Sequence, residues 1–441
     1  MEKNQSRRNW LKTMTAGMAG LLAAEQLSGK ALSYSEAGSK FNVSKALMSP
    51  RDSIKITKLE IIPVNTLRTI FVRMHTDAGI IGIGEGTVEG RITTTMAAIK
   101  ELEGYLIGKD PRKPAFHWQA IYRHAFYRGD IILTSALSAV DIAMWDIKGK
   151  ALGVPVYELL GGPTRDRVRV YGQAGSPKEA QEVIDQGFKS MKVGVTSSRG
   201  RLSRLVENPD FVQGIVENVS AIRKVIGPAV DMGIELHGDH SPQTSMLIIK
   251  ALEPFQPWFY EEPIQFENLP LMAEMAKKTT IPFATGERMV TKWQFRDLLT
   301  LASASILQPD VTHCGGITEL KAISILAEAF YAAMLPHSKE GMVGTVASLH
   351  VVSSIPNLLA HELPSLQAAP DDGVKRSALG KSYIKKPLVM GSDGHITLEG
   401  NIDGPGLGLE LDDNLIENER GVKEWEFPEM WDSFDGSVLD H

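Results

Sequence analysis

Three acidic residues follow short apolar segments at equal spacing in the middle of the chain. Glu235, Glu261 and Glu287 each end such a segment, and each acid lies 26 residues from the next. This spacing is about the length of one strand, its loop and one helix, so consecutive units would bring the carboxylates to the same end of neighbouring parallel strands. Three oxygen ligands on one rim suit Mg²⁺, which prefers octahedral oxygen coordination. The alternative is that each acid is a solvated loop residue.

Further groups suited to acid–base chemistry end the other strands of this pattern. Asp310 and His337 end consecutive predicted strands, and an Asp bound to one imidazole nitrogen raises the basicity of the other. His237 lies two residues after Glu235, on the same strand face, and could supply an acid opposite that base. Glu362 ends the last strand. A single histidine is more often structural, but these two share a rim with the acids.

Strand and helix patterns alternate over residues 163–380. Apolar runs and the amphipathic segments between them indicate repeated β/α units. Eight strands at this spacing favour a closed parallel barrel, in which reactive groups gather at the carboxyl ends of the strands. The predicted strands are 168–174, 190–195, 229–236, 258–261, 282–285, 305–308, 332–335 and 358–361.

A smaller α+β domain is predicted at residues 53–162. Its strands are expected at 54–64, 69–76 and 80–86, and its helices at 93–106, 115–123 and 135–152. Gly153 is a typical helix stop. Residues 381–441 contain short β-like pieces and a Trp-rich tail, which we expect to pack on this domain.

The first 33 residues have the features of an export signal. Arg7 and Arg8 precede a short apolar run, and the Arg pair indicates the twin-arginine route. We therefore expect a periplasmic or otherwise exported protein, or a cytoplasmic one if the pair is accidental. Residues 34–52, rich in Ser, Gly and Lys, are expected to be a linker.

Composition and charge narrow the classes of partner. The formal net charge of the 441-residue chain is −6, with no long run of Lys or Arg, which argues against a nucleic-acid partner. The single cysteine, Cys314, excludes an intramolecular disulfide framework and a multi-cysteine zinc site. We expect a small-molecule substrate, no membrane contact after signal removal, and assembly into a homo-oligomer.

Several motifs resemble those of the mandelate racemase branch of the enolase superfamily. They are Glu261-Glu-Pro263, Gly286-Glu-Arg288, Gln308-Pro-Asp310 and Gly315-Gly-Ile-Thr318. The segment from Trp145 to Gly162 is similar to galactonate dehydratases in particular. The resemblance covers residues 54 to about 410. It implies an α/β fold: a modified (β/α)₇β barrel of TIM type, with an N-terminal α+β capping domain that the C-terminal segment completes.

The resemblance also implies a role for each rim residue. It places one Mg²⁺ on the three glutamates, a basic dyad at His337 and Asp310, and a second histidine at His237. Glu362 would hydrogen-bond the substrate carboxylate, which requires its protonated form if it is to donate. The capping domain would contact the distal hydroxyls, with Arg68 and the Tyr127-Arg128 pair as candidates.

Two departures from the family pattern bear on the reaction. The first metal ligand is usually Asp in this group, whereas Glu235 is one methylene longer. Lys192-Val-Gly194 stands where racemases carry a Lys-x-Lys pair, which weighs against racemisation. The predicted reaction is loss of the proton α to the carboxylate and dehydration of a sugar acid, such as galactonate, to a 2-keto-3-deoxy acid. A cycloisomerase or epimerase on a related sugar acid, and an exported non-catalytic binding protein, are the alternatives.

Overall fold

The computed structural model describes residues 49, 52–64, 69–195, 206–338, 341–363, 383–422 and 436. The predicted export signal, most of the linker and Arg68 lie outside these residues. Among the helices of the described part, none combines the length and the apolar character that crossing a membrane requires.

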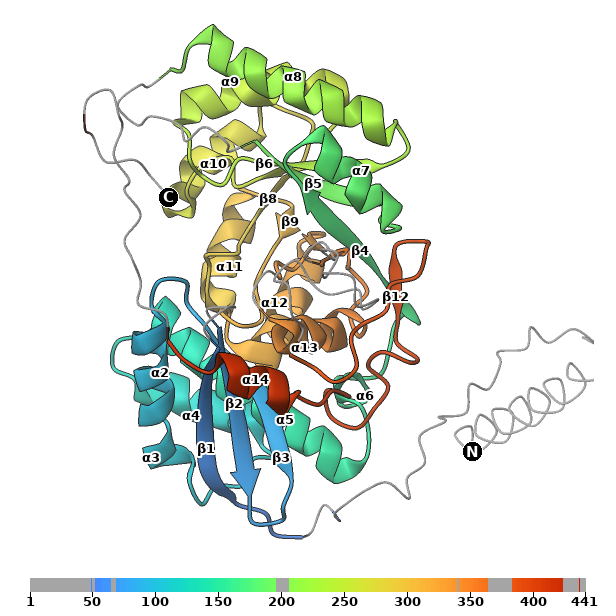
Figure 1. Cartoon of the computed structure of the whole chain (residues 1–441). Coiled ribbons are helices and arrows are strands. Elements are labelled where there is room, and N and C mark those ends of the chain that lie inside the picture. Colours follow the sequence, from blue (N-terminus) through green and yellow to red (C-terminus); the bar gives the residue numbers. More distant parts are fainter. Residues whose placement is uncertain are drawn as a thin grey trace, which may run out of the picture. The chain divides into compact units, whose positions relative to one another are not determined.

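A three-stranded antiparallel sheet and a set of helices make up the capping domain (Figure 1). The strands are β1 (Ile56–Val64), β2 (Thr69–Thr76) and β3 (Ile81–Glu85). The helices are α2 (Ile92–Glu101), α3 (Glu103–Leu106), α4 (Pro114–His124), α5 (Ile131–Leu152) and α6 (Val156–Leu159). Helix α5 contacts both β3 and the barrel helix α12, so it joins the capping sheet to the barrel.

One helix start and one helix break in this domain differ from the prediction. Helix α5 starts four residues earlier than expected, because the Asp130 carboxylate accepts from the N–H groups of Ile132 and Leu133 and caps it there. It ends at Gly153 in the left-handed conformation, as predicted. The segment predicted as one helix over 93–106 is divided at Leu102 into α2 and α3.

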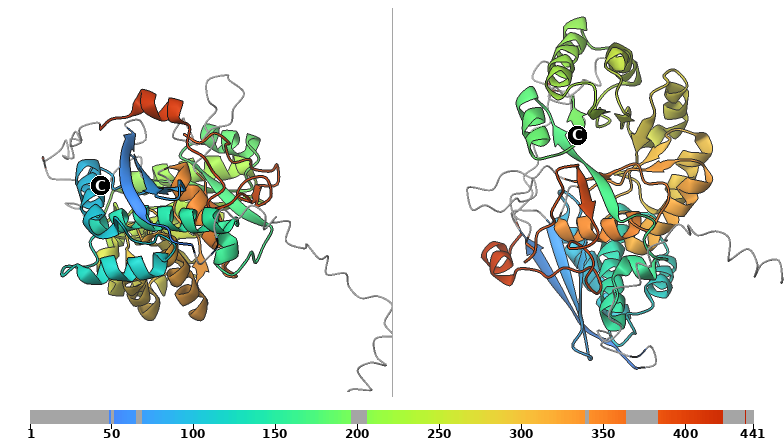
Figure 2. Two further views of the ribbon diagram at one scale, coloured as in Figure 1. Left: turned by 90° about the horizontal axis from the view of Figure 1, so that it is seen from below. Right: turned by 90° about the vertical axis from the view of Figure 1, so that its right-hand side faces the viewer.

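The strands of the barrel are parallel and follow one another around a curved sheet (Figure 2). They are β4 (Arg167–Ala174), β5 (Ser190–Gly194), β6 (Asp231–Glu235), β7 (Tyr260–Glu261), β8 (Phe283–Thr285), β9 (Ile306–Leu307), β10 (Ala333–Met334) and β11 (His361–Glu362). The circle closes where β11 pairs with β4 and where Leu358 forms a parallel bridge to Met334. The predicted last strand, 358–361, spans this closure and ends one residue early.

One helix follows each barrel strand from β4 to β10, as the (β/α)₇β arrangement requires. These helices are α7 (Pro177–Asp185), α8 (Pro209–Ile226), α9 (Pro242–Leu252), α10 (Leu269–Ala276), α11 (Thr291–Leu301), α12 (Gly316–Ala329) and α13 (Met342–Val352). Short 3₁₀ turns at Glu253–Phe255 and Phe266–Asn268 lie beside β7. The predicted fold class is confirmed.

The C-terminal segment contacts both parts of the fold. Strand β12 (His395–Thr397) pairs antiparallel with β4 of the barrel, and α14 (Asp413–Glu419) follows. Arg420 then forms an antiparallel bridge to Val64 of β1. The Asp146 carboxylate of α5 accepts from the N–H of Leu407 at 2.9 Å. The described part of the segment therefore completes the capping domain and adds a strand to the barrel, whereas the Trp-rich tail lies outside the described residues.

Buried polar contacts join the capping domain to the barrel at α12. The Asp141 carboxylate of α5 accepts from Thr318 N at 2.9 Å and from Thr318 Oγ1 at 2.6 Å. Trp145 Nε1 donates to the same hydroxyl at 2.8 Å. Because Thr318 lies in the first turn of α12, Asp141 caps a barrel helix from the other domain.

Replacing Asp141 by Asn tests the protonation of this contact. Burial raises the pKa of Asp141 from 3.8 to about 7, although the hydrogen bonds from Thr318 lower it. Between these pH values the unfolded carboxyl is ionised and the folded one is not, so stability falls as pH rises. Asn carries no such proton. We therefore expect Asp141→Asn to gain stability relative to the wild type between about pH 4 and pH 7.

Urea unfolding of both proteins, followed by circular dichroism at several pH values, measures this difference. A free-energy difference that stays constant across the range would contradict the assignment.

Candidate active site

The three predicted metal ligands meet at the carboxyl end of the barrel. Glu235 ends β6, Glu261 ends β7 and pairs with it in register, and Glu287 lies two residues after β8. One oxygen from each carboxylate can be chosen so that all three lie within 4.8 Å of one another. The spacing along the sequence therefore corresponds to a cluster in space.

A buried lysine, to which the sequence assigned no role, contacts this cluster. Lys192 of β5 is 1% exposed. Its Nζ lies 2.7 Å from Glu261 Oε1, 3.1 Å from Glu362 Oε1 and 3.4 Å from Glu235 Oε1. Burial alone would lower the pKa of Lys192, but these carboxylates hold it well above its usual value. Lys192 is therefore the counterion of three acids on three different strands.

Negative charge remains in excess around this lysine. Burial, together with the charges of Glu235 and Glu362, raises the pKa of Glu261 to about 8 although Lys192 lowers it. A carboxylate in that position is ionised at neutral pH only if more positive charge is supplied. The carboxylate oxygens and this unbalanced negative charge fit a divalent cation such as Mg²⁺.

A second group of residues with ligand spacing overlaps the first. His237, Glu262 and Glu287 also bring one atom each within 4.8 Å of one another. Glu262, however, already pairs with Arg288, whose Nη2 lies 3.1 Å from its Oε2. The set of three glutamates is therefore the better candidate for a metal.

The predicted dyad is formed and firmly oriented. His337 Nδ1 lies 2.8 Å from Asp310 Oδ2. The other oxygen of Asp310 accepts from Thr312 N at 2.7 Å and from Thr312 Oγ1 at 2.6 Å. Although burial favours protonation, His313 and His337 hold the pKa of Asp310 below its usual range. Asp310 thus fixes one imidazole nitrogen of His337 and leaves Nε2 directed toward the acids.

The two histidines face different oxygens of one metal-ligand candidate. His337 Nε2 lies 3.6 Å from Glu287 Oε2, and His237 Nε2 lies 3.8 Å from Glu287 Oε1. The backbone of His237 is left-handed, with φ of 56°, and its carbonyl accepts from Arg288 Nη2 at 2.9 Å. The pKa of His237 is raised, mainly by its side-chain interaction with Asp239. The structure therefore brings an acid candidate and a base candidate to the same carboxylate.

The contacts of Glu362 favour its ionised form rather than the expected protonated form. Its Oε1 accepts from Gln173 Nε2 at 2.6 Å, and its Oε2 accepts from Ser338 N at 3.0 Å. Burial would raise its pKa, but Lys192 and His337 lower it overall. Glu362 is thus an ionised acceptor, because its neighbours are donors from other strands that the sequence does not place beside it.

Several of these side chains line a cavity of about 570 Å³ between the barrel mouth and the capping domain. The barrel contributes Gln173, Lys192, Glu235, His237, Glu287, Arg288, His313 and His337, and the capping domain contributes Val88, Glu89, Gly129 and Ile131. Both domains therefore line this cavity.

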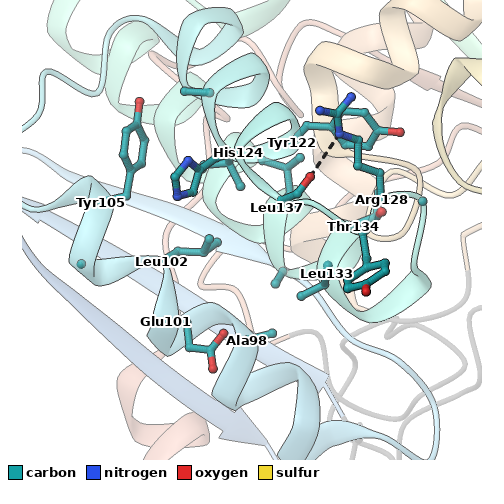
Figure 3. A pocket seen from close by; sticks show the side chains of 17 residues that line it. Ala98, Glu101, Leu102, Tyr105, Tyr122, His124, Arg128, Leu133, Thr134 and Leu137 are labelled. Carbon is teal, nitrogen blue, oxygen red and sulfur yellow. Dashed lines mark hydrogen bonds between the residues drawn. The ribbon is translucent and has the colours of Figure 1, made fainter.

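Tyr127 and Arg128 line a different cavity, of about 700 Å³, within the capping domain (Figure 3). Arg128 Nε donates to Ala125 O at 3.1 Å and its Nη2 donates to Arg123 O at 3.0 Å. The guanidinium also lies over the Tyr122 ring. Arg128 is thus engaged by its own domain, and of residues 127–129 only Gly129 lines the rim cavity. Substrate binding by this pair, and by Arg68, stays a prediction.

Both halves of the chain match known protein families. Residues 44–161 match the N-terminal domain of the mandelate racemase/muconate lactonizing enzyme family, and residues 176–415 match the enolase C-terminal domain-like family. A D-galactonate dehydratase of Ralstonia nicotianae is 37% identical over 394 residues, which cover 88% of this chain and 100% of that one. A D-galactonate dehydratase of Pectobacterium atrosepticum is 36% identical with the same coverage.

Solved structures of the enolase superfamily also resemble this chain. A member of the enolase superfamily from Salmonella Typhimurium superposes with a TM-score of 0.75 and 28% identity, over 83% of this chain and 98% of that one. The 3,6-anhydro-D-galactonate cycloisomerase from Zobellia galactanivorans superposes with a TM-score of 0.73 and 27% identity, over 83% and 99%.

The expected resemblance and the expected enzyme class, a carbon–oxygen lyase, are therefore confirmed. The chain belongs to the mandelate racemase/muconate lactonizing enzyme family of the enolase superfamily.

Proposed function

We propose that this protein dehydrates a sugar acid of the aldonate class, with galactonate as the first candidate, to a 2-keto-3-deoxy acid. The observation that carries this proposal is the approach of His337 and His237 to the two oxygens of Glu287, with Asp310 bonded to His337. Dehydration needs one group that removes a proton and another that protonates the departing hydroxyl. The names of the two dehydratase relatives support the same reaction.

One Mg²⁺ per subunit is part of this proposal. Glu235, Glu261 and Glu287 would hold it. Bound there, the ion would act as a Lewis acid that stabilises negative charge on the substrate carboxylate. Lys192 lines the same cavity and can pair with that carboxylate as well. By stabilising the negative charge that develops on the substrate carboxylate, Mg²⁺ and Lys192 would also make the proton on C2 more acidic.

The dyad would remove the C2 proton. Because Asp310 accepts from Nδ1, the lone pair of His337 resides on Nε2, which faces the cavity. Against the effect of burial, Glu287 is the strongest cause that raises the pKa of His337. Pairing Glu287 with a cation weakens that effect and leaves more of the neutral imidazole that accepts a proton.

His237 would protonate the departing C3 hydroxyl. Its raised pKa keeps a larger share of it as the imidazolium, which is the form that donates. The carbonyl contact from Arg288 holds its strained backbone, so the ring stays at the rim. Proton removal and hydroxyl departure are thereby assigned to different residues. The enol product then tautomerises to the keto acid.

A cycloisomerase is the second candidate, because one structural neighbour acts on 3,6-anhydro-D-galactonate according to its name. That reaction would use the same base and cation. The higher identity to the dehydratases favours dehydration. Non-catalytic binding receives less support because the acid and base candidates are both in place. Epimerisation receives less support because Lys192-Val-Gly194 lacks the second lysine of the racemase pair. Export by the twin-arginine route is a separate proposal that rests on Arg7 and Arg8.

The metal proposal predicts that Glu261→Gln loses Mg²⁺ and turnover together. Even a change of an outer-shell partner typically costs about 10–100-fold in metal affinity, so loss of a ligand should cost at least as much. Calorimetric titration with Mg²⁺ measures binding, and release of keto acid from galactonate measures turnover. Full activity of metal-free wild type after EDTA treatment would refute the proposal.

Two further variants complete this test. Glu274→Gln changes an exposed acid of α10 that pairs with Lys277, and it should leave both readouts unchanged. Glu235→Asp restores the ligand that is usual in the family and should keep Mg²⁺. Loss of binding in that variant would mean that the pocket depends on the longer side chain.

The division of roles predicts that the two histidines fail differently. His337→Asn removes the base, so both dehydration and exchange of the C2 hydrogen with deuterated water should stop. His237→Asn removes only the acid, so exchange should continue while keto acid production falls. General acid or base groups contribute about 10²–10⁴-fold, so each loss is easy to measure.

Nuclear magnetic resonance of the recovered substrate gives the exchange rate, and His124→Asn, at an exposed histidine of α4, is the control. If His237→Asn stops exchange as completely as His337→Asn while it still binds Mg²⁺, the roles are misassigned.

A further inference from the structure

A carboxylate of the capping domain reaches into the barrel beside the dyad. Glu85 is the last residue of β3 and is fully buried. Its Oε2 accepts from Gly344 N at 2.8 Å, with Val343 N as a further donor. Its Oε1 accepts from Thr69 Oγ1, at the start of β2, at 2.9 Å. One oxygen of Glu85 is thus held within the capping sheet, and the other connects that sheet to the first turn of α13.

Helix α13 depends on this contact because it has no N-terminal cap of its own. Its N-cap residue is Gly341, which has no side chain to accept from the first turn. All residues of α13 are buried, so water does not reach its first N–H groups. A carboxylate at this place satisfies them and is favoured by the helix dipole. A Cβ at Gly341 would lie only 2.2 Å from Glu85 Oε1, so glycine is required there.

The first turn of α13 contacts both members of the dyad through one intermediate residue each. A Cβ on Gly344 would lie 2.6 Å from Thr312 Cγ2, and Thr312 donates twice to Asp310. Thr345 Oγ1 lies 2.8 Å from the hydroxyl of Ser338, the residue after His337. A displacement of this turn would therefore move the supports of the Asp310–His337 pair.

We propose that Glu85 is a positioning residue for the base. By capping α13 from the other domain, it holds Thr312 and Ser338 in place and so sets the geometry of the His337–Asp310 hydrogen bond. Docking of the capping domain and alignment of the base are then one event. The inference rests on the proposed function only in that His337 removes the C2 proton.

The central test is Glu85→Met, which keeps a similar volume and removes both acceptors. Because misplacing a catalytic group by about 1 Å can lower the rate ~10²-fold, we expect kcat to fall about 10–100-fold. KM should stay within about threefold, since Glu85 does not line the substrate cavity. Glu85→Gln keeps an acceptor for Gly344 N and should restore most of kcat. Unchanged kcat in a folded Glu85→Met protein would overturn the proposal.

The matched control is Asp141→Leu. It removes the other buried carboxylate by which the capping domain caps a barrel helix, but Asp141 contacts Thr318 and not Thr312. This variant should lose thermal stability and keep its kcat. An equal loss of kcat in Asp141→Leu would show that weakened domain docking, rather than alignment of the base, explains both variants.

A readout without turnover separates this inference from the proposed reaction. The proton between His337 Nδ1 and Asp310 should give a low-field ¹H resonance, identified by its absence in His337→Asn. Glu85→Met should shift or broaden it, whereas Glu85→Gln and Asp141→Leu should preserve it. If the Met variant does not fold, Glu85→Asp, which is too short to bridge Thr69 and Gly344, is compared instead.

The two possible failures are distinguishable. A wild-type protein that neither exchanges the C2 hydrogen nor dehydrates galactonate refutes the proposed function, while the resonance still tests Glu85. An unchanged resonance in Glu85→Met or Glu85→Asp refutes the positioning role even if the wild type is an active dehydratase.

Discussion

The ion cluster around Lys192 is the constraint on which the mouth of the barrel depends. Its ammonium group contacts Glu235, Glu261 and Glu362, which come from β6, β7 and β11. Buried charges of this kind are tolerated only when they are paired, and removal of one partner typically costs about 3–5 kcal/mol. The strand register, which places the acids at one level, and the closure that brings β11 beside β4 are both needed for this pairing. The same cluster retains the excess of negative charge that suits a divalent ion.

The capping domain is a structural part of the catalytic site as well as its cover. Two of its carboxylates, Asp141 and Glu85, satisfy the first N–H groups of the neighbouring barrel helices α12 and α13. Both acids are buried, and burial raises the pKa of each to about 7. Each domain therefore leaves polar groups that only the other one satisfies. The two domains of this chain therefore depend on each other for these contacts.

The sequence predicted much of this site because its chemistry follows the strand period. Glu235, Glu261 and Glu287 could be placed together from their spacing alone, and the adjacent strands of Asp310 and His337 predicted their contact. The contacts of Lys192 with Glu362 and of Glu85 with Gly344 could not be predicted. They depend on barrel closure and domain docking, which no local pattern encodes. The ionised state of Glu362 was missed for the same reason.

The pairing of the C-terminal segment has a consequence for biosynthesis. Arg420 bridges to Val64, and its guanidinium contacts Glu60, 360 residues earlier in the chain. Strand β1, the first strand of the described residues, therefore acquires this neighbour only after the barrel between them has been made. Contacts of such long range are slow to form, and an unpaired strand edge favours aggregation in the meantime. Strand β1 therefore lacks this partner until the barrel and Arg420 have both been synthesised.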